Sequence, residues 1–405
     1  MEILDNIIVI KFGGSVLKND ETIRKSVDMI FELYEKGMRP LVVVSALKGA
    51  TDNLLTLAKT LNHDTSPEIM DQILSMGERT CARLFSTALA SKGLKNVIVD
   101  PEFENWPIIT DDTHLDSNPI YDDTEKEVTR KILPMLENRE IPVVCGFIGK
   151  TKEGKITTLG RGGSDTTAIL LASCLNAREI VLVKDVETVF SSDPDVVTGT
   201  VPLKNLDSEE AFLLSSGGAK FLHTKALNYN KKGIRIRISS LENGSNLGTI
   251  INGGIIDLMV EPSPDQVTMV TIIGDKVLND SQIHQLMTAI NNIDGQILSL
   301  TLDSKSTILY VVNGRNLIDN IHKIVMENKL GKAVSFFEDL RMILVKGSAL
   351  ETIPGLIQRV TQPLARKNIN LYGLITISSS IRLFVSKKQL EKTLPLLRTA
   401  LLSLK

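Results

Sequence analysis

The chain alternates between short apolar runs without polar residues and longer stretches in which apolar residues recur every three or four positions. Runs without polar alternation predict strands buried on both faces, as in a mostly parallel sheet. The strands predicted in this way are residues 7–10, 41–44, 96–100, 141–149 and 179–183, of which 96–100 and 179–183 have polar residues only at their ends. The longer stretches predict helices between the strands, at residues 21–36, 68–92 and 124–138. The alternation of strand and helix predicts a doubly wound α/β domain.

The pattern changes after residues 261–266, EPSPDQ, whose prolines and acids predict a linker. Beyond it the order strand, helix, strand, strand, helix occurs twice, and the second copy includes a helix at 353–367. This order is that of a split β-α-β, ferredoxin-like unit. We therefore expect one domain over residues 1–255 and two repeats over 266–332 and 333–405. If the two repeats are interleaved in space, the boundaries between them would shift.

Composition narrows the class of protein. A chain of 405 residues exceeds the size of a single core, which rarely passes about 250 to 300 residues. A formal net charge of −2 gives no reason to expect a nucleic acid or an anionic membrane as partner. No window reaches the ~18 consecutive apolar residues of a membrane span, and the acidic start of the chain does not resemble a signal peptide. We expect a cytoplasmic protein.

Cysteine and histidine do not indicate a metal centre or a disulfide framework. The chain has three cysteines, Cys81, Cys145 and Cys174, which are far apart and odd in number. We expect them to be reduced, buried thiols. The five histidines show no metal-ligand spacing. We therefore expect no metal site formed by the chain itself.

The first predicted strand ends in the sequence KFGGS, residues 11–15. Lys11 lies near the carboxyl end of the strand, Gly13 and Gly14 allow the backbone to approach a ligand, and Ser15 can cap the following helix. A glycine turn before a helix N-terminus, with a lysine beside it, is the layout of an anion-binding site. Taken alone, a Gly-Gly pair after a strand is more often an ordinary turn.

Further candidates follow the other strands. Ser45 and Thr51 come at the carboxyl end of the second strand, where such sheets bind ligands, although both hydroxyls could instead cap a helix starting near residue 52. Arg161 stands among three glycines in GRGGSD, where Ser164 or Asp165 can cap the next helix. An arginine held in this way is placed to bind a carboxylate or a phosphate with both arms of its guanidinium.

Four motifs in order, KFGGS, GRGGSD, KDV…SSDP and GGAK, resemble those of the amino acid kinase superfamily. With VSALKGAT, GER and the two ACT-like repeats, the chain resembles the aspartokinases of that superfamily over nearly its whole length. The resemblance implies a three-layer α/β/α sandwich followed by two ferredoxin-like βαββα ACT domains. It implies transfer of a phosphoryl group from ATP to the side-chain carboxylate of L-aspartate, with Mg²⁺ held largely by the phosphates.

The resemblance also implies roles for individual residues. Lys11 and Asp165 would be catalytic. The substrate aspartate would be held by Ser45, Thr51, Glu78, Arg161 and Ser164. The nucleotide would be held by Lys11, Phe12, Gly13, Gly14, Lys184, Asp185, Phe190, Asp193, Lys220 and Phe221. An effector such as lysine, threonine or both would bind at the ACT-like repeats, through which we expect a homodimer or homotetramer.

Three positions depart from the pattern of the aspartokinases. Thr188 stands where a glycine is usual, Asp195 where an arginine is usual, and Thr224 where a proline is usual. The first two motivate an alternative function, a non-catalytic amino-acid sensor built on a kinase fold. Another alternative is a kinase for a different amino acid such as glutamate. An N-acylated substrate fits less well, because it has no ammonium group for Glu78 to bind.

Overall fold

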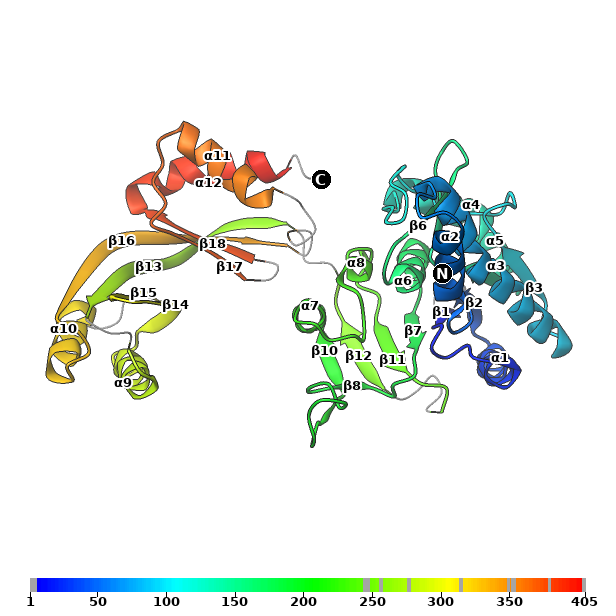
Figure 1. The fold of residues 1–405 in the computed structure, drawn as a ribbon, viewed down its shortest axis with the longest axis horizontal. Coiled ribbons are helices and arrows are strands. Elements are labelled where there is room, and N and C mark those ends of the chain that lie inside the picture. The colour runs from blue at the N-terminus through cyan, green and yellow to red at the C-terminus, as the bar shows by residue number, and fades with distance from the viewer. Residues whose placement is uncertain are drawn as a thin grey trace. The chain divides into compact units, whose positions relative to one another are not determined.

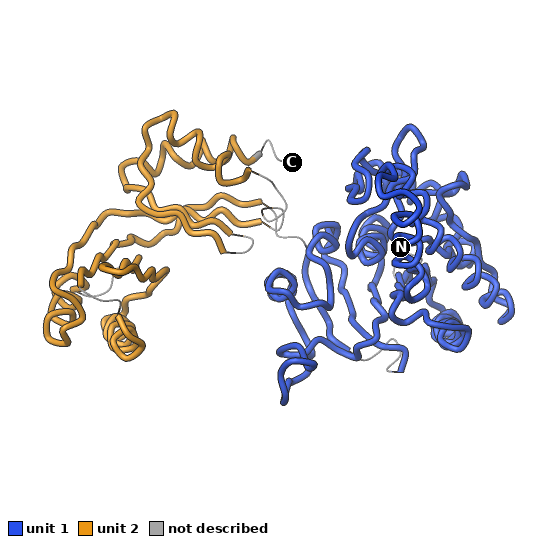
Figure 2. Tube along the Cα trace, in the orientation of Figure 1, with its two compact units in different colours: residues 1–256 blue, residues 257–405 orange. Residues whose placement is uncertain are grey.

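The structure is a computed structural model that describes residues 6–242, 248–254, 258–274, 278–312, 316–347, 350, 355–377 and 380–402. The chain divides into two compact units, residues 1–256 and 257–405 (Figure 2).

The described residues of the first unit form an eight-stranded sheet with the strand order β10-β12-β11-β7-β1-β2-β4-β3 (Figure 1). Its strands are β1 (Ile7–Phe12), β2 (Arg39–Val44), β3 (Asn96–Val99), β4 (Ile141–Cys145), β7 (Glu179–Val183), β10 (Asn205–Asp207), β11 (Ile236–Ser239) and β12 (Thr249–Asn252). All neighbours pair in parallel except β11 and β12. The central strands are buried on both faces, as their unbroken apolar runs predict.

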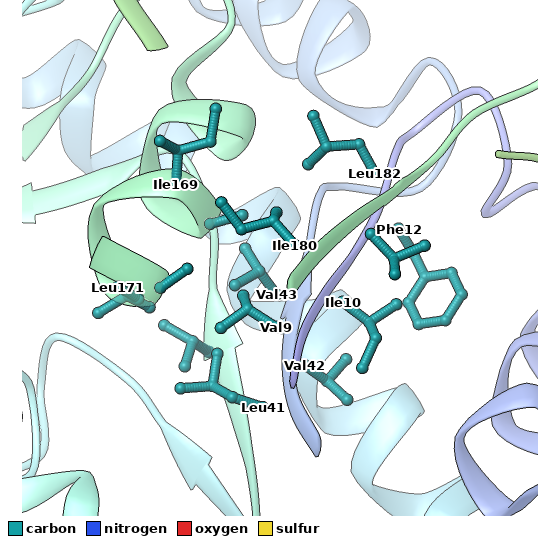
Figure 3. Packing of buried hydrophobic residues seen from close by; sticks show 14 of the residues in the cluster. Val9, Ile10, Phe12, Leu41, Val42, Val43, Ile169, Leu171, Ile180 and Leu182 are labelled. Carbon is teal, nitrogen blue, oxygen red and sulfur yellow. The ribbon is translucent and has the colours of Figure 1, made fainter. Parts of the chain in front are cut away.

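Helices cover both faces of this sheet. On one face the ring of Phe12 lies 5.3 Å from that of Phe85 on α3 (Pro67–Ser91), and α1 (Asp20–Glu35) packs against α3. On the other face Ile169 and Leu171 of α6 (Gly163–Leu175) face β1 and its neighbours (Figure 3). The predicted three-layer α/β/α sandwich is confirmed.

The remaining elements of the unit are short. The predicted helix at 124–138 is divided into α4 (Tyr121–Lys131) and α5 (Leu133–Glu137), because Pro134 cannot donate to the preceding turn. The others are α2 (Ala50–Leu61), α7 (Ser208–Ser216), α8 (Thr224–Leu227), the hairpin β5 (Ile148–Lys150) and β6 (Ile156–Thr158), and the pair β8 (Val189–Phe190) and β9 (Pro202–Leu203). The three cysteines are buried and free, as predicted.

The described residues of the second unit form a six-stranded antiparallel sheet with the order β14-β15-β13-β16-β18-β17. The first βαββα series is β13 (Met259–Ile273), α9 (Asp280–Asn291), β14 (Gln296–Asp303), β15 (Ser306–Val312) and α10 (Leu317–Glu327). The second is β16 (Ala333–Lys346), α11 (Leu356–Arg366), β17 (Gly373–Ile377), β18 (Ser380–Ser386) and α12 (Leu390–Leu402). The predicted order of elements is confirmed. Ile353, the predicted start of α11, lies outside the described residues.

The linker predicted at residues 261–266 is wrong, because these residues lie inside β13. β13 pairs with β16 along its length, and the register shifts between Pro262 and Gln266. A bulge of this kind accepts prolines, which cannot donate to a regular ladder. The two series share their long strands: Val260 of β13 packs in the core of the second series and Val270 in that of the first.

Candidate active site

The candidate site lies at the carboxyl edge of the parallel sheet. β7, β1 and β2 are neighbours there, and they end in register at Val183, Phe12 and Val44. Open α/β sheets bind ligands at this edge. A cavity of about 290 Å³ opens beside it, lined by Lys11, Ser45, Thr51, Glu78, Phe147, Gly160, Arg161, Gly162, Gly163, Ser164 and Asp165.

Asp165 is the centre of a buried ion-pair cluster. Its Oδ1 lies 2.7 Å from Nζ of Lys11, at the end of β1, and its Oδ2 lies 2.8 Å from Nζ of Lys184, directly after β7. Asp165 itself is in the first turn of α6. One carboxylate therefore fixes two ammonium groups from neighbouring strands at the N-terminus of a helix, where the backbone also attracts anions.

Burial and neighbouring charges both shift the pKa values of Asp165 and Lys11. Burial alone would raise the pKa of Asp165, but Lys11 and Lys184 outweigh it, so the pKa lies well below its usual range. Burial lowers the pKa of Lys11, and the neighbouring Lys184 adds to this, while Asp165 opposes both. Burial and ion pairing therefore act in opposite directions on both Asp165 and Lys11.

Glu78 reaches the cavity because α3 packs unusually close to the loop after β2. A Cβ on Gly77 would lie 2.7 Å from that of Ala46, so only glycine fits there. The close approach lets Oε1 of Glu78 accept a hydrogen bond of 3.0 Å from the backbone N–H of Ala46. Oε2 is buried and has no hydrogen-bond partner among the described residues.

Burial raises the pKa of Glu78 to about 7, and the hydrogen bond from Ala46 and the charge of Lys11 only partly offset this. One carboxylate oxygen of Glu78 thus has a hydrogen-bond partner, and the other has none among the described residues. A buried polar atom without a partner is costly, and such atoms are found where a ligand completes the site. The free oxygen suits a cationic group of a ligand.

Arg161 lies on a glycine loop that lines the same cavity as Glu78. Gly160 and Gly162 take positive φ of 72° and 76°, which side chains rarely adopt. A Cβ on Gly162 would also lie 2.4 Å from that of His223, so the loop is packed on its outer side. Arg161 is exposed, and its guanidinium makes no ion pair within the described ranges.

The helices at the site begin with glycine, so the predicted capping roles are wrong. Gly49 precedes α2 and Gly162 precedes α6, both in the left-handed conformation without a side-chain cap. The side chains of Ser45, Thr51, Ser164 and Asp165 are therefore not used as caps, and all four line the cavity. Ser15 does not cap α1 either, because Asn19 does so.

Three of the residues predicted to hold the nucleotide, Phe12, Gly13 and Gly14, lie at the carboxyl end of β1 or directly after it. Gly13 donates its N–H to the carbonyl of Val183, and a Cβ there would lie 3.3 Å from Nζ of Lys11. A Cβ on Gly14 would lie 3.0 Å from the carbonyl oxygen of Ala46, in the loop after β2. The side chain of Phe12 is in the core, so only its backbone faces this edge.

The other nucleotide candidates lie outside the cavity. Phe190 is half-buried in β8 and Phe221 is buried, whereas the exposed candidates are Asp185, Asp193 and Lys220. Thr188, which departs from the aspartokinase pattern, has its Oγ1 2.7 Å from Oγ1 of Thr249 on β12. The hydrogen bond between the two hydroxyls gives the polar group of Thr188 a partner in the loop. Phe147, which lines the cavity at a positive φ of 69°, had no recognisable signal in the sequence.

Comparison with known proteins identifies the family. Residues 6–240 match the model of the amino acid kinase family. The aspartokinase of Geobacillus stearothermophilus is 32% identical over 387 residues, which cover 92% of this chain and 91% of the relative. The chain belongs to the aspartokinases of the amino acid kinase family. Aspartokinase 2 of Bacillus subtilis is 29% identical, with 97% of each chain covered.

Solved structures of this family have the same fold. E. coli aspartokinase III, in complex with aspartate and ADP, is 22% identical to this chain and has a TM-score of 0.57. The match covers 98% of this chain and 100% of the E. coli chain. The aspartate kinase from Synechocystis is 22% identical with a TM-score of 0.77, and the match covers 97% of this chain and 69% of the other. None of the helices described in this chain has the length and apolar composition of a bilayer span.

Proposed function

We propose that this chain is an aspartate kinase, which transfers the γ-phosphoryl group of ATP to the side-chain carboxylate of L-aspartate. The observation that carries the proposal is the cavity itself. Among the described residues, it combines a Glu78 oxygen without a hydrogen-bond partner and an Arg161 guanidinium without an ion pair with the cluster of Lys11 and Lys184 around Asp165. E. coli aspartokinase III, a structural relative, was solved with aspartate and ADP.

The two unpaired charges match the backbone groups of a free amino acid. Oε2 of Glu78 would accept hydrogen bonds from the ammonium group, and Arg161 would bind the α-carboxylate with both arms of its guanidinium. Hydroxyls of Ser45, Thr51 and Ser164 line the same cavity and would orient the substrate. An N-acylated amino acid could not use Glu78, since it has no ammonium group.

The chemistry needs charge neutralisation rather than a base. The carboxylate of aspartate is already ionised at neutral pH, because its pKa is ~3.9. Its oxygen forms a bond to the γ-phosphorus while the bond to the bridging oxygen of ADP breaks, and no proton moves. Lys11, Lys184 and the N-terminus of α6 would offset the negative charge of the two reactants.

Mg²⁺ would enter with the nucleotide. Both oxygens of Asp165 are taken by lysines, and no cluster of three metal-binding side chains exists among the described residues. The donor set at the site therefore fits an ion that keeps the phosphates and water as its main ligands. Its contribution would be to neutralise charge on the transferred group.

A coupled assay of ADP release tests the proposal. Purified protein with MgATP should release ADP only when L-aspartate is added, and a panel with glutamate and N-acetyl-aspartate should give no turnover. Lys11→Ala should lower kcat by at least ~10³-fold. Amino-acid binding by calorimetry without any ADP release would instead support the sensor, and a Lys11→Ala protein as active as its parent would contradict the assigned role.

We also propose a homodimer or homotetramer of this chain, formed through the second unit. β14 and β17 are the edge strands of its sheet, and exposed edges pair readily. Light scattering should give a multiple of the 44.5 kDa chain mass, and a monomeric mass at micromolar concentration would contradict this.

Lysine, threonine or both would act at this unit as effectors, which the same ADP assay detects as inhibition. We place the protein in the cytoplasm.

A further inference from the structure

A second acid on α3, Asp71, is buried outside the cavity. Asp71 precedes Glu78 by seven residues, so both lie on the same face of the helix. Its side chain is fully buried. A buried carboxylate is costly unless hydrogen bonds satisfy it. The partners of Asp71 therefore show what this charge holds in place.

Asp71 joins α3 to two segments that are distant in sequence. Its Oδ1 accepts hydrogen bonds of 2.5 Å from Oγ1 of Thr158 and 3.1 Å from the backbone N–H of Leu115. Its Oδ2 lies 2.6 Å from Nδ1 of His114, which must be the donor because an ionised carboxylate only accepts. One side chain thus ties the helix to the end of β6 and to the 111–118 segment.

The tied segments hold the loop that carries Arg161. Thr158 is the last residue of β6, three positions before Arg161. Its carbonyl accepts hydrogen bonds from both the backbone N–H and the Oγ of Ser117. Nζ of Lys225 donates to the carbonyls of Ser117 and Leu159 at 2.9 Å each. The two residues before the glycine loop are therefore held by hydrogen bonds from Ser117 and Lys225, and Thr158 is also bonded to Asp71.

From these contacts we infer that Asp71 is a positioning residue that sets the distance between Glu78 and Arg161. Glu78 and Asp71 share one helix, and Asp71 is hydrogen-bonded to the strand end that leads to Arg161. If Glu78 binds the ammonium and Arg161 the α-carboxylate, these two anchors fix the direction of the side-chain carboxylate. Only one stereoisomer then points this carboxylate at the γ-phosphoryl group, and a displaced anchor would weaken the selection. The inference rests on the proposed function.

The test compares L- and D-aspartate in variants of Asp71. Asp71→Asn keeps the size and one acceptor oxygen but turns the other acceptor into a donor. We expect kcat/KM for L-aspartate to fall at least tenfold and the ratio of kcat/KM for L- over D-aspartate to fall at least fivefold. KM for MgATP should change less than twofold. Thr158→Val, which removes one hydroxyl, should shift the ratio in the same direction by a smaller factor.

Glu68→Gln is the matched control. Glu68 is one turn before Asp71 and pairs with Lys155 at 3.2 Å, so it also joins α3 to the β5–β6 hairpin, but at the exposed surface. It should leave the L/D ratio unchanged. If Asp71→Asn does not fold, Thr158→Val gives the decisive ratio. An unchanged ratio with only a lower Tm would overturn the inference, whereas an inactive parent protein would contradict the proposed function itself.

Discussion

The two ends of β7 carry similar ion-pair clusters in different surroundings. At the carboxyl end, Asp165 lies between Lys11 and Lys184. At the amino end, Glu179 lies between Arg235 and Arg237, with the nearer arginine nitrogen at 2.8 Å. Both acids are buried. An acid between two cations is therefore not by itself the mark of a site.

What distinguishes the carboxyl end is the unpaired charge beside the cluster. Neither Glu78 nor Arg161 has an ion pair among the described residues, whereas at the amino end both arginines are paired with Glu179. A charge that is paired within the protein is already held in place by its partner. An unpaired charge that lines a cavity is available for the opposite charge of a ligand. The comparison predicts that variants of the paired acids act on stability, and that only those near the cavity also act on turnover.

The largest effect should come from Asp165→Asn. The change leaves Lys11 and Lys184 without their shared counter-charge in a buried position. We expect the free energy of unfolding to fall by about 3 to 5 kcal/mol and turnover to fall at least ~10³-fold. Urea unfolding and the ADP assay measure the two effects.

Glu179→Gln is the control for that variant, because it neutralises the corresponding acid at the other end of the same strand. It should lower stability and leave kcat and both KM values unchanged in the protein that remains folded. A large loss of turnover in Glu179→Gln, with Asp165→Asn still active, would reverse the assignment of the two ends.

The next effect concerns Glu78 and has the opposite sign for stability. The pKa of Glu78 is raised from 4.5 to about 7 by burial, so the folded state binds this proton more tightly than the unfolded state. The free energy of unfolding therefore falls as pH rises between these values. At pH 8, Glu78→Gln should be more stable than the parent by up to ~3 kcal/mol. At pH 4 the two should be equally stable in denaturant unfolding.

The same pKa predicts a pH dependence of substrate binding. Only the ionised Glu78 can bind the ammonium group of aspartate. Between pH 6 and pH 8 its ionised fraction rises from about a tenth to about nine tenths, so kcat/KM for aspartate should rise about tenfold. Initial rates at low aspartate across this range measure the effect. A similar rise in Glu78→Gln, which has no such proton, would show that another group titrates.

The sequence was sufficient for most of the fold. Apolar runs such as 41–44 located the central strands, because a strand buried on both faces leaves no polar position. It failed at 261–266, since prolines are typical both of linkers and of bulges and only the pairing with β16 separates the two.

The site was predictable only in part. Lys11 and Arg161 stood out through their glycines, but Glu78 was found only through family resemblance, because burial of a helix acid has no local signal. The meaning of Gly77 depends on its contact with Ala46. Asp71 was missed because its partners Thr158 and His114 are 87 and 43 residues away in the chain.

The last variant, Arg161→Lys, affects substrate binding without an expected change in stability. A lysine keeps the charge but cannot make two parallel hydrogen bonds to a carboxylate. We expect KM for aspartate to rise about tenfold, a loss of about 1.4 kcal/mol, with little change in kcat or in KM for MgATP. Stability should not change, because Arg161 is exposed and has no ion pair among the described residues. Arg130→Lys, an exposed arginine of α4 paired with Glu127, is the control. If KM for MgATP rises instead, Arg161 binds phosphate, and the unpaired charges would then belong to different ligands.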